Sequence, residues 1–198
     1  DEDVMDFFQV DTIEMGRGFL REDSDWKPWV LPDGTPCEIP YYIELEERDG
    51  DWILFDGEGE ETGIMKKGSL YFEQTHFPLM ERGIENDHFE DLEEMLGRNM
   101  WSAVVHPGAH LEMDEKGLHE MARRAGALRE STDRAVIGLF GGNMFELPQM
   151  LYRMDHYLLA TGLYPHKVAE LSEKLAAIHM KNLEKWLGAV GPYIDVVL

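Results

Sequence analysis

A pair of glycines followed by polar side chains is the part of this chain best suited to contact a small ligand. The apolar run 134–140 leads directly into Gly141, Gly142 and Asn143, and Glu146 follows three residues later. Glycines after a buried strand let the backbone approach a ligand closely, and an amide and a carboxylate beside them can orient it or act on it. We therefore predict a catalytic role for Glu146 and substrate contacts from Gly141, Gly142, Asn143 and Phe145. The alternative is a glycine turn into a helix that Asn143 caps.

Two further carboxylates lie near the start of the chain. Asp11 and Glu14 belong to the predicted strand 11–15, which runs into Gly16 and Gly18. Carboxylates at the carboxyl end of a barrel strand can exchange protons with a substrate, so we predict catalytic roles for both. Capping and salt-bridging roles are the alternative for the same two residues.

Two histidines four residues apart, His106 and His110, are candidates for the wall of a substrate pocket. Within a helix this spacing would place both imidazoles on one face, as a zinc site requires. Pro107 and Gly108 interrupt a continuous helix here. We therefore predict that both histidines contact substrate, and we assign no metal ligand in this chain. Surface positions without a function are the alternative.

Short apolar strands that alternate with helical segments would position these side chains. The predicted strands are 11–15, 134–140 and 192–198, and the predicted helices are 3–8, 87–96, 114–130, 144–160 and 165–188. Apolar, β-branched strands joined by helices are typical of a parallel sheet, so we expect an α/β fold. The run 192–198 reads as a buried strand with an open edge, so we expect residues 1–198 to be an incomplete part of a larger barrel.

A different pattern occupies about 38–75, where apolar residues recur with a period of two. The turn pairs Asp49-Gly50 and Lys67-Gly68 each separate two short alternating segments. Such pairs predict antiparallel β-hairpins. We interpret this region as an antiparallel β-hairpin insertion in the α/β fold.

Charge and composition exclude several function classes. The 198 residues include 40 acidic and 18 basic side chains, for a formal net charge of −22. The resulting field repels phosphate backbones and anionic lipid surfaces, so we expect neither nucleic acid nor a membrane as a partner. No apolar run reaches the roughly 18 to 20 residues that cross a bilayer. The single Cys37 fits a reducing compartment, so we expect a cytoplasmic protein.

From about residue 114 onward the chain resembles the uroporphyrinogen decarboxylase (URO-D) superfamily. The resemblance rests on the glycine–aromatic strand end within 135–146, the proline-started helix within 158–168 and the aspartate-bearing strand 193–197. It implies a (β/α)8 TIM barrel, of which residues 1–198 would be an incomplete domain with a β-hairpin insertion at about 38–75. The family's substrate-contacting tyrosine is not matched after the glycines, because Tyr152 is displaced from its place.

The resemblance implies an enzyme with one of two chemistries. We favour the methyltransferase-like branch, which moves methyl groups between small substrates and corrinoid proteins or thiols and more often carries an extra hairpin region. Porphyrinogen decarboxylation is the alternative, and a non-catalytic binding or assembly module, with the hairpins as a homodimer contact, is a third. The expected partners are a small-molecule substrate and a corrinoid protein. The branch's zinc ligands, a His-x-Cys pair and a further Cys, are not matched by Cys37, so a zinc would be held outside residues 1–198.

Overall fold

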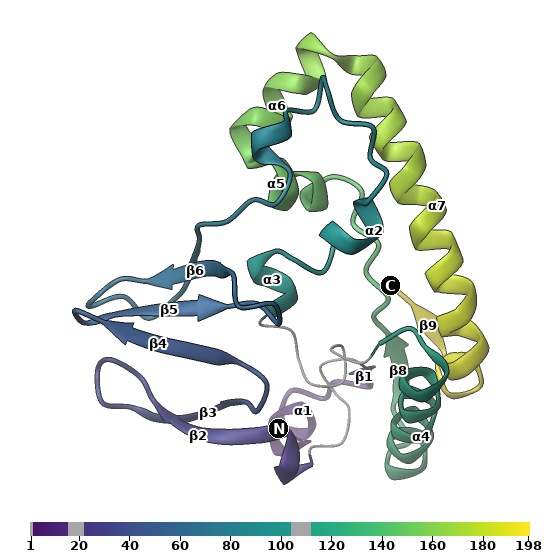
Figure 1. The fold of residues 1–198 in the computed structure, drawn as a ribbon. Coiled ribbons are helices and arrows are strands. Elements are labelled where there is room, and N and C mark those ends of the chain that lie inside the picture. Colours follow the sequence, from purple (N-terminus) through teal and green to yellow (C-terminus); the bar gives the residue numbers. More distant parts are fainter. Residues whose placement is uncertain (1, 16–21, 104–111) are drawn as a thin grey trace. The chain divides into compact units, whose positions relative to one another are not determined.

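A computed structural model describes residues 2–15, 22–103 and 112–198 (Figure 1). The chain divides into two compact units that each combine separate stretches of sequence. The first unit contains residues 1–23, 106–142 and 179–198, and the second contains residues 24–105 and 143–178. Helix α7 (Pro165–Val190) therefore contributes its first part to the second unit and its last part to the first.

Three parallel strands form the sheet of the first unit. β8 (Ala135–Gly138) lies in the middle, with β1 (Thr12–Met15) on one side and β9 (Val196–Val197) on the other. β1 and β8 pair along all four of their residues, whereas β9 adds only two pairs. Asp195 anchors β9, because its Oδ2 accepts hydrogen bonds from the Val136 amide at 2.8 Å and from Nη1 of Arg129 at 2.7 Å.

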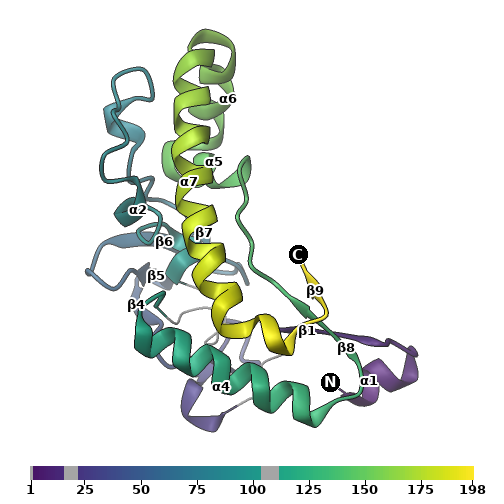
Figure 2. The same ribbon diagram turned by 90° about the vertical axis from the view of Figure 1, so that its right-hand side faces the viewer.

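Helix α4 (Glu115–Ser131) and the last turns of α7 pack on one face of this sheet (Figure 2). Burial alternates along β1 and β8, as expected for strands with one covered face. The core of the first unit is formed by Ile13, Met15, Met121, Ala125, Leu128, Val136, Trp186 and Val190. Asp114 caps α4 by accepting a hydrogen bond from the Gly117 amide at 2.7 Å, which confirms the predicted start of this helix. Helix α1 (Glu2–Phe7) precedes β1.

The predicted TIM barrel is wrong. The described strands form three small sheets, one parallel and two antiparallel, and none of them closes into a barrel. The strands of a barrel are buried on both faces, whereas Glu14 and Ile137, on the face of this sheet opposite to α4, are partly exposed. The predicted buried strand 192–198 is also shorter. Its start forms the 3-10 helix η4 (Gly191–Tyr193), and Val196 and Val197 of β9 are 51% and 46% exposed.

The second unit contains both antiparallel sheets. After the 3-10 turn η1 (Asp23–Asp25), β2 (Trp26–Val30) pairs with β3 (Pro36–Pro40). The other sheet has the order β4 (Glu44–Arg48), β5 (Asp51–Phe55), β6 (Glu61–Met65) and β7 (Glu73–Gln74). β4 and β5 confirm the predicted hairpin at Asp49-Gly50. The tight hairpin predicted at Lys67-Gly68 is wrong, because Ser69 and Tyr71 hydrogen-bond to each other after these residues and β6 pairs with β7.

Most helices of the second unit surround a separate core. They are η2 (Met80–Arg82), α2 (Leu92–Met95), α5 (Glu146–Tyr152), α6 (Met154–Leu163) and the first part of α7. Fully buried members of this core include Leu79, Leu92, Leu151, Leu171 and Leu175. Met100 of α3 (Met100–Ala103) instead packs with Ile43 and with Leu54 of β5 in another cluster. The predicted helix 87–96 is reduced to α2, because Phe89 has a left-handed φ of 55° that interrupts it. Among the described residues, no helix combines the length and apolar character that would let it cross a membrane.

Candidate functional site

The predicted glycine pair forms a corner after β8, in the first unit. Gly141 and Gly142 have φ angles of +85° and +80°, which glycine adopts without strain. A Cβ atom at Gly142 would lie 3.4 Å from the Phe140 ring and 3.8 Å from Cγ of His179. The Phe140 ring packs on Trp186, with the ring centroids 5.6 Å apart. We call Phe140, Gly141, Gly142, His179 and Trp186 the glycine corner.

His179 brings an unsatisfied polar atom to the glycine corner. Its Nε2 atom is buried and has no hydrogen-bond partner among the described residues. Burial lowers the pKa of this imidazole, so the neutral form prevails near pH 7 and one ring nitrogen can accept a proton. Buried polar atoms of proteins are nearly always paired, so Nε2 is the atom of the glycine corner that most needs a partner beyond the described residues.

The other predicted residues of the glycine segment belong to the second unit, at the start of α5. Oδ1 of Asn143 accepts hydrogen bonds from the amides of Phe145 at 3.0 Å and Glu146 at 2.8 Å. Nδ2 of Asn143 donates to the Glu146 carboxylate at 2.7 Å, and the Phe145 ring contacts Tyr157. These contacts are those of a helix start, which is the alternative interpretation given above for Asn143.

The two carboxylates near the start of the chain lie near opposite ends of β1. Asp11 precedes β1, and its backbone oxygen accepts a hydrogen bond from the Ala135 amide at 2.9 Å. Glu14 is the third of the four residues of β1 and lies on the partly exposed face of the sheet. Asp11 therefore lies at the other end of the sheet from the glycine corner, which follows the carboxyl end of β8. His106 and His110 lie outside the described residues.

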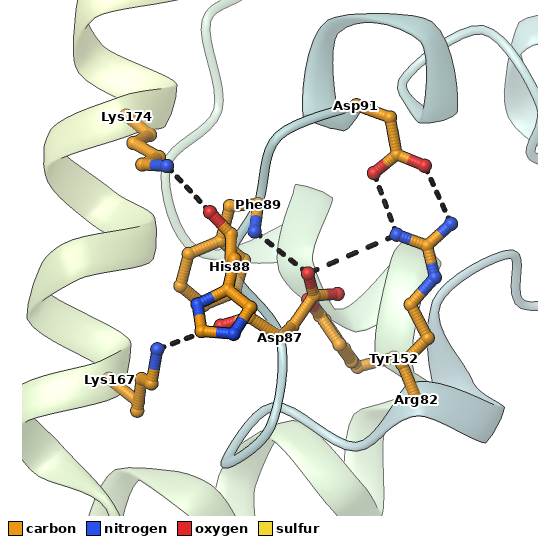
Figure 3. Close-up of polar contacts among 8 residues, drawn as sticks. All are labelled: Arg82, Asp87, His88, Phe89, Asp91, Tyr152, Lys167 and Lys174. Atoms are coloured by element: carbon orange, nitrogen blue, oxygen red, sulfur yellow. Dashed lines mark hydrogen bonds and ion pairs between the residues drawn. The ribbon is translucent and has the colours of Figure 1, made fainter.

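A buried polar network lies in the second unit (Figure 3). The Tyr152 hydroxyl donates to Oδ2 of Asp87 at 2.8 Å, and the two residues are only 1% and 4% exposed. Nη1 of Arg82 lies 3.9 Å from Oδ1 of Asp87, and both Nη atoms of Arg82 bind the Asp91 carboxylate, at 2.7 and 2.6 Å. Burial and the hydrogen bond to Asp87 raise the pKa of Tyr152, so the phenol stays protonated and acts as a donor.

Two lysines of α7 hold the loop that carries Asp87. Nζ of Lys167 donates to the backbone oxygen of Asp87 at 2.7 Å, and Nζ of Lys174 donates to that of His88 at 2.6 Å (Figure 3). Both ammonium groups also face the ring of Phe89, at 5.2 and 5.9 Å from its centroid. Phe89 keeps its left-handed backbone under these contacts. The network therefore fixes the shape of this loop.

Sequence analysis missed His179 and the Tyr152–Asp87 pair as residues of interest. His179 lies in the apolar stripe of a long helix. A histidine that only packs in the core would give the same sequence pattern as one with a function. Tyr152 and Asp87 are 65 residues apart and belong to different elements. Their contact depends on tertiary packing, for which the local sequence pattern contains no signal.

The zinc implied by the sequence resemblance has no matching donor set in the described parts of the chain. Cys37 lies in β3, in register with Trp29 of β2. Residues 2–15, 22–103 and 112–198 contain no group of three or more His, Cys, Asp or Glu side chains placed to hold a metal ion. These residues do not fit a zinc centre.

Comparison of the chain with protein-family models, with curated proteins and with solved structures finds no match. The resemblance to the URO-D superfamily therefore stays a prediction from the sequence.

Proposed function

We propose that this protein transfers methyl groups between a small substrate and a corrinoid or a thiol, and that it binds a reactant at the glycine corner. The sequence resemblance motivates the reaction class. We choose this site because the Nε2 atom of His179 is buried there and has no hydrogen-bond partner among the described residues.

The position of the corner supports this proposal. In open α/β sheets, ligands bind beyond the carboxyl ends of the parallel strands. Phe140 and the glycines directly follow β8, the central strand, and the Phe140 amide donates to the backbone oxygen of Leu198 after β9, at 2.9 Å. The corner therefore lies where two neighbouring strands end.

A neutral imidazole at this place suits the activation of a thiol. The S–H bond breaks as its proton moves to a ring nitrogen of His179, which burial keeps in the neutral form by lowering its pKa. The thiolate sulfur then forms a bond to the methyl carbon of a methyl–cobalt(III) corrinoid. The electron pair of the broken carbon–cobalt bond stays on the metal, which leaves as cobalt(I), and the imidazolium later releases its proton to water.

The side chains of the corner favour methyl transfer over porphyrinogen decarboxylation. A polycarboxylate substrate requires cationic groups that bind its carboxylates. The glycine corner consists of two glycines, two apolar aromatic side chains and a histidine with a lowered pKa. This set offers an apolar wall and a proton acceptor.

The test is anaerobic incubation of the purified protein with methylcobalamin and 2-mercaptoethanol. We expect loss of the methylcobalamin absorbance and formation of the S-methyl thioether, faster than in a protein-free blank. His179→Gln should lower the rate by about 100-fold, the low end of the usual effect of a general base, whereas His119→Gln on the exposed face of α4 should leave it unchanged. A rate equal to the blank, or an unchanged rate in a folded His179→Gln variant, would overturn the proposal.

A further inference from the structure

A cavity lies entirely within the second unit, apart from the glycine corner. It has a volume of about 400 Å³ and lies between the segment 80–86 and helix α6. Tyr152 of the buried network and Tyr164 at the end of α6 also line it. We call this cavity the α6 pocket.

The walls contributed by α6 are apolar and partly open to solvent. Leu159 and Leu163 line the pocket and are 62% and 58% exposed, while Ala160 and Ile84 are buried beside them. Exposed leucines are unremarkable when scattered, but here they share one cavity with two tyrosines. A ligand with an apolar body would remove this surface from water, which favours binding.

The charged groups of the pocket leave an excess of negative charge. Arg82 is neutralised, because both of its Nη atoms are bound to Asp91 in the arrangement drawn in Figure 3. Glu81 and Glu85 also line the pocket, and neither has an ion-pair partner in the part of the chain that the structure describes. The carboxylate of Glu85 lies against Gly83, since a Cβ there would be 2.9 Å from its Oε2 atom. One carboxylate is therefore held directly at the pocket wall.

His156 also lines the pocket, and its Nε2 lies 3.1 Å from Nη2 of Arg153, which is itself bound to Asp155. The net charge of −22 on the whole chain adds a long-range attraction for cations.

We propose that the α6 pocket binds a small organic cation with an apolar body, such as a quaternary or protonated alkylamine. Glu81 and Glu85 would attract the charge, the leucines would cover the alkyl groups, and the tyrosine rings would face the cation. The pocket contains no residue of the glycine corner, so this inference does not depend on the proposed methyl transfer.

The test compares choline with 3,3-dimethyl-1-butanol, its neutral isostere, in NMR titrations of the ¹⁵N-labelled protein. We expect choline to shift the amide signals of Gly83 and Asn86 and to bind roughly tenfold more tightly than the isostere, as a cation held by carboxylates and aromatic faces should. The double variant Glu81→Gln/Glu85→Gln should remove this preference. The control Glu58→Gln/Glu94→Gln removes the same number of negative charges at exposed positions of the same unit. This control should preserve the preference for choline.

Three results would overturn the inference. Equal binding of choline and the isostere would mean that the pocket recognises only apolar surface. Absence of shifts at Gly83 and Asn86 with millimolar choline would mean that it binds no such cation. An unchanged preference in the Glu81→Gln/Glu85→Gln variant would assign the recognition to other residues.

Discussion

Replacing Tyr152 with phenylalanine isolates one hydrogen bond of the buried network. The variant keeps the ring and removes the hydroxyl that donates to Asp87 at 2.8 Å. Asp87 is 4% exposed, so water cannot readily replace the lost donor. Its carboxylate keeps the hydrogen bond from the Phe89 amide and its longer contact with Arg82. A hydrogen bond to a charged group contributes roughly 1.5 to 3 kcal/mol, so we expect Tyr152→Phe to lower the free energy of unfolding by about 2 kcal/mol.

Tyr157 provides the matched control in the same core. It is 3% exposed, but its hydroxyl has no hydrogen-bond partner among the described residues. We expect Tyr157→Phe to change stability by less than about 0.5 kcal/mol. Urea unfolding followed by circular dichroism at 222 nm measures both variants. If the two variants lose the same free energy, the Tyr152–Asp87 hydrogen bond does not stabilise the fold in the way argued here.

Three further predictions concern the first unit. Gly138→Ala would place a Cβ 2.6 Å from Trp186 and 2.9 Å from Ile194, so we expect a loss of about 1 to 3 kcal/mol. Gly188→Ala, with open space around it in α7, should instead stabilise the protein by about 0.5 to 1 kcal/mol. The same urea unfolding assay measures both variants, and free-energy changes of the same sign would contradict the reasoning. Hydrogen bonds from Arg123 and Arg124 lower the pKa of Glu120 from 4.5 to about 2, so its stabilisation is complete above pH 4.5 and is lost as the pH falls through 2. The difference in Tm between the wild type and Glu120→Gln should follow that course, and a difference independent of pH would refute it. Asp195→Ala should speed amide exchange of Val136 and Leu198, because β9 loses its anchor, and unchanged exchange would show that Asp195 does not hold the strand.

Local sequence signals predicted the elements well where a single chemical rule decides them. The Asp114 cap sets the start of α4, Pro165 starts α7, and the turn at Asp49-Gly50 joins β4 to β5. The apolar run before the glycines forms β8, a strand of a parallel sheet, as predicted, and this strand lies in the centre of the sheet. These features depend on backbone conformations and hydrogen bonds within a few residues.

The barrel prediction failed because the sequence of a strand does not determine whether other elements cover one or both of its faces. Strand composition led us to expect burial on both faces, whereas helices cover one face of β1 and β8 in the structure. The helix expected from 87 was shortened by the left-handed backbone at Phe89, which tertiary contacts from α7 support.

The candidate site was predicted only in part, for the same reason. Gly141 and Gly142 do form a glycine turn after a strand, but the imidazole beside them comes from α7, far along the chain. Asn143 and Glu146, which we predict to contact a substrate, bind each other at the start of α5. A pattern read along the sequence shows which residues are polar, but not which of them the fold leaves without partners.

The central claim is that the glycine corner receives a small reactant through His179, and imidazole ¹⁵N NMR tests it most directly. On addition of methylcobalamin and 2-mercaptoethanol, we predict that the Nε2 resonance of His179 shifts together with the amide signals of Gly141 and Gly142. Unchanged resonances at all three residues, under conditions where the protein demonstrably turns over or binds either reagent, would contradict the account.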